Sequence, residues 1–248
     1  MKILVCISHV PDTTSKINFT PDNKAFDTNG VQFVINPYDE FGLTRALWFK
    51  EKLGGSVTAL NVGTSVTEPT LRKALAIGAD DAIRIDAEPT DAFFVAKQIA
   101  EVVKENAYDL VIMGRESIDY NGGQVPGMVA ELLGWPFVNA CVGMEVENGS
   151  ATCIREIDGG KEKVRASLPM VVGGQKGLVE ESDLRIPNMR GIMTARKKPL
   201  NVRQPAEAEK RSSAVSYEKP PAKAEVKMVD PANMDELVRY LHEEAKVI

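Results

Sequence analysis

The feature that most constrains this chain is a regular alternation of short apolar segments with segments of helical periodicity in its first half. Residues 2–8, 57–62, 82–85 and 110–113 have the length and continuous hydrophobicity of strands that are covered on both faces. Helical patterns lie between and after them, the clearest over residues 91–107. This rhythm predicts right-handed crossovers and an α/β fold, a twisted, mostly parallel sheet with helices on both faces.

Further helices are predicted from Asn36-Pro37 to the glycines that follow residue 53, over residues 68–77, and over about residues 123–133. Residues 11–34 interrupt the alternation with a polar stretch that is rich in Gly, Asn and Asp. Short β-like pieces at 16–19 and 31–35 predict a hairpin inserted after the first strand.

After Trp135-Pro136 the pattern changes to β-like runs at 138–146, 151–157, 162–167 and 170–172, with turns at 147–149 and 158–160. We expect these runs to be antiparallel additions to the sheet. From residue 187 the chain is polar, basic and interrupted by proline, and it ends in a short amphipathic helix at about 234–245. Such a segment is an extended C-terminal arm that wraps a partner, or else a disordered tail.

Composition excludes several classes of protein. A net charge of -5 provides no broad cationic surface for nucleic acid. No apolar stretch reaches the length of a membrane span, and the start MKILVCIS lacks the features of a signal peptide, so a cytoplasmic location is expected. Three cysteines in apolar runs and two histidines offer no ligand set for a metal. Any redox role therefore requires an organic cofactor.

In an open parallel sheet, ligands bind beyond the carboxyl ends of the strands. The segments there are 8–12, 36–39 and 114–127, of which the last joins a glycine-rich loop to a helix start that could hold a phosphate. The loop matches no standard phosphate motif, and an ordinary turn is the alternative. The alternative for Asp39 is a plain helix start, and a lone histidine such as His9 is more often structural than catalytic.

Six ordered segments between Lys2 and Leu200 resemble the electron-transfer flavoprotein beta subunit family, and the resemblance covers nearly the whole chain. They are KILVCISHVPD, INPYDEFGLTRAL, LRKALAIGADDAIRI, DLVIMGRESIDYNGGQVPG, REIDGGKEKVRASLPMVV and PNMRGIMTARKKPL. The resemblance implies a fold like that of adenine-nucleotide alpha-hydrolase domains, and an electron carrier subunit without catalysis of its own. It also implies AMP in this subunit and FAD held mainly by an alpha subunit, at the interface of a heterodimer. Implied partners are flavin dehydrogenases, such as acyl-CoA dehydrogenases, and a downstream quinone-linked oxidoreductase.

Carried over position by position, the resemblance implies that AMP lies at the strand ends identified above. Tyr38 also matches an aromatic position that approaches the flavin, where a ring can pack without chemistry of its own. The expected cofactor-binding residues are Cys6, Asn36, Pro37, Tyr38, Asp39, Val62, Gly114, Arg115, Glu116, Ser117, Ile118, Asp119, Tyr120, Asn121, Gly122, Gly123, Gln124 and Val125.

The stretch before Ile192-Met193 resembles the loop through which family members dock dehydrogenases with one apolar anchor. Ungapped matching places the anchor at Met189, and matching on Pro187-Asn188 places it at Ile186. An exposed apolar side chain there suits an interaction site, and packing against the chain's own sheet is the alternative. The expected organisation is a nucleotide-binding domain at 1–185, a recognition loop and helix at 186–200, and an arm at 201–248 that packs on the alpha subunit.

The glycine loop departs from the family pattern, because Val125 and Pro126 replace residues that could offer a hydroxyl and an N–H. Some relatives hold a second FAD in place of AMP and split an electron pair between two acceptors, and this stays an alternative. Alternatives from other classes are a nucleotide hydrolase, disfavoured because residues 8–12 form no pyrophosphatase loop, and a stress-protein-like nucleotide-binding module.

Overall fold

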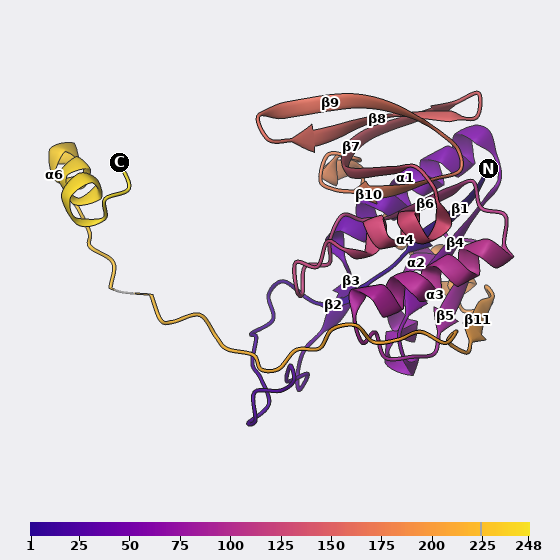
Figure 1. Cartoon of the computed structure of the whole chain (residues 1–248), viewed down its shortest axis with the longest axis horizontal. Coiled ribbons are helices and arrows are strands. Elements are labelled where there is room, and N and C mark those ends of the chain that lie inside the picture. The colour runs from indigo at the N-terminus through magenta and orange to yellow at the C-terminus, as the bar shows by residue number, and fades with distance from the viewer. Residues whose placement is uncertain (224) are drawn as a thin grey trace.

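The computed structural model describes residues 1–223 and 225–248 (Figure 1). Within these residues, a nine-stranded sheet has the order β11-β5-β4-β1-β6-β10-β7-β8-β9. The strands are β1 (Lys2–Cys6), β4 (Ser56–Val62), β5 (Asp81–Ile85), β6 (Leu110–Gly114), β7 (Phe137–Glu147), β8 (Ser150–Ile157), β9 (Gly160–Ser167), β10 (Met170–Gly174) and β11 (Leu200–Arg203). All neighbours from β11 to β7 are parallel, and only β8 and β9 are added antiparallel. The predicted α/β fold is confirmed.

The strand order reverses direction at β1. The chain runs from β1 outward through β4 to β5, and then returns to place β6 on the other side of β1. At such a switch point the connections leave β1 and β6 toward opposite faces, so a crevice opens beyond their carboxyl ends.

Helices cover both faces of the sheet, as predicted. The helices α1 (Pro37–Leu53) and α2 (Glu68–Ile77) share one apolar cluster with Ile3 and Val5 of β1, and α3 (Ala92–Glu105) and α4 (Val125–Leu133) share the other with Leu4. Because successive strand residues face opposite ways, the uninterrupted apolar run of β1 supplies both clusters. The first turn of α1 and the start of α4 are thereby held at the carboxyl edge of the sheet.

One expected element of the inserted stretch is wrong. The strand β3 (Phe33–Ile35) pairs antiparallel with β2 (His9–Pro11), so a two-stranded ribbon does follow β1. Residues 16–19, however, form no strand, and Phe19 makes only an isolated bridge with Phe26. The hydrogen-bonding edge of β3 is instead taken by residues that directly follow β1.

The expectation that every β-like run after residue 137 would be antiparallel is also wrong. The strand β10 is inserted between β6 and β7 and runs parallel to both. The strand β11, which the sequence did not indicate, pairs with β5 and extends the sheet beyond residue 185. Both strands are short, and their partners are distant in sequence, so local pattern does not specify their direction or pairing.

The last part of the chain leaves the sheet. Residues 204–223 and 225–233 contain no helix or strand, and the chain ends in α6 (Met234–Arg239) and the π-helical turn η3 (Tyr240–Glu244). Figure 1 shows α6, in yellow, well away from the sheet and its helices. Met228 and Val226 on the way to α6 are 87% and 81% exposed.

Candidate functional site

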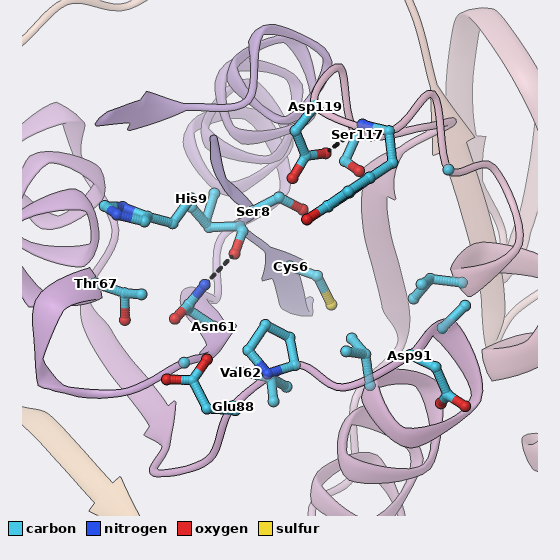
Figure 2. Close-up of a pocket in the computed structure, with 18 of the residues that line it drawn as sticks. Cys6, Ser8, His9, Asn61, Val62, Thr67, Glu88, Asp91, Ser117 and Asp119 are labelled. Carbon is cyan, nitrogen blue, oxygen red and sulfur yellow. Dashed lines mark hydrogen bonds between the residues drawn. The ribbon is translucent and has the colours of Figure 1, made fainter. Parts of the chain in front are cut away.

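A cleft of about 990 Å³ opens at the carboxyl edge of the sheet, at the switch point between β1 and β6. Its floor includes Cys6 at the end of β1, Val62 at the end of β4 and Gly114 at the end of β6. Figure 2 shows Cys6 and Val62 in the middle of the cleft, with Ser117 and Asp119 on one side. The predicted location beyond the strand ends is therefore where the structure has its large cavity.

Asp39 ties three elements together at one side of this cleft. Its carboxylate accepts the N–H of Ser8 at 2.7 Å and the N–H of Gly114 at 2.6 Å, so the first turn of α1 joins the ends of β1 and β6. The side chain is 2% exposed, and this burial raises its pKa to about 7. A side chain at Gly114 would collide with Asp39 and Tyr38, so the approach requires glycine there.

Asn36 holds the loop that follows β6. Its Nδ2 donates to the carbonyl of Glu116 at 2.9 Å, and its Oδ1 accepts the N–H of Ile118 at 3.3 Å. The residue is 1% exposed and precedes α1 without capping it through its side chain. Asn36 thus holds the loop at 115–118 through two hydrogen bonds but does not itself line the cleft.

The glycine loop leads into α4, and Gln124 precedes that helix without a side-chain cap. The first-turn N–H groups of a helix lack intrahelical acceptors, and they carry the positive end of the helix dipole. Gly122, Gln124 and Val125 line the cleft, so this end of α4 can donate to an anion. Pro126 in the first turn has no N–H and reduces the number of donors.

The charged side chains that line the cleft are acidic. Among the described residues that line it there is no lysine and no arginine. The lining carboxyl groups belong to Asp39, Glu88, Asp91, Glu116 and Asp119. A highly charged anion would find no cation to pair with, and recognition would depend on neutral donors.

The base of the cleft combines apolar and amide groups. Asn61 is 4% exposed and donates from Nδ2 to the carbonyl of Ile7 at 2.8 Å. Burial raises the pKa of the Cys6 thiol, so Cys6 is a neutral packing group. His9 stacks on Phe33, with ring centroids 4.4 Å apart, and its Nδ1 lies 2.7 Å from the Thr70 hydroxyl. These contacts give the imidazole a positional role without an acidic partner.

A second cavity of about 610 Å³ lies on the other side of the first turn of α1. It is lined by Tyr38 and Arg115, by Glu156 of β8, and by residues that follow β10. Arg115 donates to Gln175 Oε1 at 2.9 Å and to Glu116 Oε2 at 3.0 Å, and its guanidinium lies 5.9 Å from the centre of the Tyr38 ring. Adjacent residues of one helical turn therefore face different cavities, Tyr38 the second one and Asp39 the large cleft.

The expected cofactor-binding residues separate into three groups. Eleven line the large cleft, namely Cys6, Asp39, Val62, Gly114, Glu116, Ser117, Asp119, Tyr120, Gly122, Gln124 and Val125. Tyr38 and Arg115 line the second cavity. Five line neither cavity: Asn36, Pro37, Ile118, Asn121 and Gly123.

Several lining residues did not emerge from the sequence. Glu88 and Asp91 follow β5, and the strand-end rule that identified the other segments would have found them. Figure 2 shows both on the side of the cleft opposite Ser117 and Asp119. Residues 212–214 and Tyr217 also line the cleft, although they lie about a hundred residues from the other walls. No local signal in the sequence marks them.

The segment at 186–200, for which a docking role is expected, is held in place by contacts with α2. In α5 (Met189–Ala195), Gly191 lies so close to the helix α2 that a Cβ would collide with the carbonyl oxygen of Ala76. Arg72 of α2 donates to the carbonyls of Ala195 and Lys198. Ile186 is 80% exposed and Met189 76% exposed, so neither candidate anchor packs on the sheet.

Two further observations concern function. In the part of the chain that the structure describes, no three His, Cys, Asp or Glu side chains gather in a way that could hold a metal ion. None of the described helices combines the length and the hydrophobicity that a membrane crossing requires.

Comparison with known proteins agrees with this architecture. A family model described as the electron transfer flavoprotein domain matches residues 24–208. The chain is 37% identical to the electron transfer flavoprotein subunit beta of Syntrophomonas wolfei, over 90% of this chain and 88% of that protein. Its identity to the subunit beta of Bacillus subtilis is 34% over the full length of both, and to that of Homo sapiens 33% over 89% of each. The chain belongs to the family of electron transfer flavoprotein beta subunits, which take part in electron transfer.

Proposed function

We propose that this chain is the nucleotide-binding subunit of a heterodimeric electron carrier, in which the large cleft holds AMP. The observation that carries the proposal is the position of the cleft at the β1/β6 switch point, with the start of α4 on its wall. The floor of Cys6, Val62 and Gly114 suits a flat base, and the end of α4 suits one phosphate.

The charge of the lining favours a monophosphate over a triphosphate. Each additional phosphate would enter a cleft that has carboxyl groups and, within the described residues, neither lysine nor arginine on its walls. Like charges at short range in a partly buried site cost free energy. The same feature argues against a nucleotide hydrolase, which needs cationic groups or a metal to stabilise a transferring phosphoryl group.

The second cavity is the proposed approach of the flavin. FAD, which we expect to be carried mainly by an alpha subunit, would supply the redox chemistry, because this chain offers no redox group beyond its thiols. The ring of Tyr38 offers an apolar face, and beside it lies the Arg115 guanidinium, which is held in place by Gln175 and by its ion pair with Glu116. The chain's own contribution is position and electrostatics, without catalysis by itself.

The volume of the large cleft favours an alternative ligand that is larger than AMP. A volume of 990 Å³ lies near the upper end of the range for small-molecule sites, about 300–1,000 Å³, and exceeds what a mononucleotide needs. A second FAD in place of AMP would then make the carrier a bifurcating one. AMP is our first assignment.

The exposed docking segment supports an exchange of electrons with flavin dehydrogenases such as acyl-CoA dehydrogenases, followed by delivery to a quinone-linked oxidoreductase. Ile186 and Met189 are the most exposed apolar side chains of this segment, in which Ile192 and Met193 are also exposed, and one of the first two would fill a pocket of the partner. The exposed apolar residues of the arm, including Val226 and Met228, would pack on the alpha subunit.

The test is to co-express the chain with the alpha subunit, purify the complex, release its ligands with acid and quantify them. One FAD and one AMP per heterodimer support the proposal. Two FAD and no AMP would assign the large cleft to a second flavin, and a complex without adenine nucleotide would refute the assignment of the cleft.

A further inference from the structure

Residues 206–219, here called the strap, connect β11 to the distal part of the arm, and four of them line the large cleft. Figure 1 shows this segment leaving β11, passing α3 and reaching the inserted loop near β2. The strap contains no helix or strand, so its path depends on its contacts with the rest of the chain. Those contacts occur at three separate points.

The first contact is a pair of hydrogen bonds with the side-chain amide of Gln98 in α3. Gln98 Nε2 donates to the carbonyl of Ala206 at 2.9 Å, and Gln98 Oε1 accepts the N–H of Ala206 at 2.7 Å. Gln98 is only 2% exposed with the strap in place, and both polar groups of its side chain are paired with Ala206. The strap is therefore tied to the core at its start.

The second contact lies at the N-terminus of α3. Asp91 caps the helix by accepting the N–H of Phe94 at 2.7 Å, and it also accepts the N–H groups of Arg211 and Ser212. The Arg211 guanidinium lies 3.6 Å from the centre of the Phe93 ring. One carboxylate thus orders both the helix start and the strap, which fixes Ser212 beside the cleft.

The third contact is made by Tyr217 on the opposite side of the opening. Its ring stacks on Phe19 with centroids 5.3 Å apart, and its N–H donates to the carbonyl of Asn23 at 2.8 Å. Lys219 then donates to Asn18 Oδ1 at 2.7 Å. The strap spans from α3 to the inserted loop and is attached at both ends.

Between these attachments the strap faces the cleft. Ser212, Ser213, Ala214 and Tyr217 all line it, whereas Val215 does not line it and is 84% exposed. Tyr120 of the glycine loop lines the same cleft while 67% exposed, and partial loss of solvent together with the neighbouring Tyr217 hydroxyl raises its pKa to about 12. The strap and the glycine loop therefore approach each other over the opening.

We infer that the strap is the roof of the nucleotide cleft, and that Tyr217 is a binding residue that retains the adenine nucleotide. This inference rests on the proposed function and extends it to residues of the C-terminal arm. A nucleotide on the floor formed by β1, β4 and β6 would be covered by residues 212–217, and it would leave only when a strap contact breaks. The strap supplies hydroxyl groups and an aromatic ring, and these suit a ribose and a purine.

The experiment measures nucleotide release from the assembled complex. The heterodimer is loaded with radiolabelled AMP and then chased with excess unlabelled AMP. In Tyr217→Ala, loss of the ring contact should raise the release rate about tenfold, because a tenfold change corresponds to the free energy of one aromatic contact. Gln98→Leu, which removes the first attachment without touching the cleft lining, should also accelerate release.

Val215→Ala is the matched control, because Val215 belongs to the same segment but points away from the cleft. Its release rate should equal that of the unaltered complex. If both Tyr217→Ala and Gln98→Leu release AMP at the unaltered rate, the roof assignment is overturned while the nucleotide cleft stands. If the unaltered complex neither contains nor takes up adenine nucleotide, the proposed function itself fails.

Discussion

The buried carboxyl group of Asp39 makes the stability of this chain depend on pH in an unusual direction. Its pKa is raised to about 7 in the folded chain by burial, whereas in the unfolded chain it should lie near the ordinary value of 3.8. Between these values the unfolded state loses the proton and the folded state keeps it. Stability from this group is therefore full at low pH and falls as the pH rises toward 7.

Asp39→Asn removes this titration and retains the shape of the side chain. The two carboxyl oxygens accept Ser8 N–H and Gly114 N–H, and even the protonated group can do so, whereas the NH2 of Asn cannot accept; the lost hydrogen bond costs about 1–3 kcal/mol at low pH. Between about pH 4.5 and 7 the unaltered chain then loses about 3 kcal/mol relative to the variant. The two stabilities should approach each other, or cross, near neutral pH.

The assay is urea unfolding of both full-length chains, followed by the fluorescence of Trp48 and Trp135 at a series of pH values. Only the difference between the chains is used, so the titration of all other groups cancels. A difference that stays constant from pH 4.5 to 7 would show that Asp39 ionises normally, and it would refute the burial argument.

Three other substitutions test the loop, the docking helix and the anchors. Asn36→Ala leaves two backbone groups of the loop at 115–118 unpaired and should raise the dissociation constant of AMP about tenfold, measured by equilibrium dialysis. Gly191→Ala places a Cβ against the carbonyl of Ala76 and should lower the free energy of unfolding by about 1–3 kcal/mol in urea. Met189→Ala or Ile186→Ala should slow electron transfer from a dehydrogenase about tenfold in stopped-flow experiments, with the nucleotide retained.

Each of these has a control in the same chain. The control for Asn36→Ala is Asn201→Ala, at an exposed position on β11. The control for Gly191→Ala is Gly160→Ala, where a Cβ would meet nothing within 4 Å. Leu53, 44% exposed at the end of α1, serves for the anchors. Equal effects in variant and control would contradict the contact in question, and unchanged transfer rates in both anchor variants would contradict the docking assignment.

The parallel core could be predicted from the sequence because its signal is local. Strands buried on both faces need continuous apolar runs, and those of β1 and β6 are clear without any knowledge of their neighbours. The direction of β10 could not be predicted, since its five residues pair with β6 and β7, and nothing within them distinguishes a parallel from an antiparallel neighbour. The four residues of β11 alternate apolar and polar side chains, but the run is too short to distinguish a strand from a loop.

The part of the candidate site that lies at the carboxyl ends of strands could be predicted from the sequence. Residues at the ends of β1, β4 and β6 do line the large cleft. What the sequence could not show is that Tyr38 and Asp39 face different cavities, because this depends on how α1 is rotated against the sheet. The lining contributed by Tyr217 depends on contacts between segments that lie far apart in the chain.

The place of the strap near the end of the chain has a consequence for biosynthesis. A ribosome completes the floor and walls of the cleft, from β1 to the start of α4, long before it delivers residues 206–219. During that interval the proposed roof is absent, and a nucleotide would reach the floor of the cleft without displacing the strap. On our proposal, loading should therefore be faster before residues 206–219 are in place than in the finished protein, where release and uptake both require a strap contact to break.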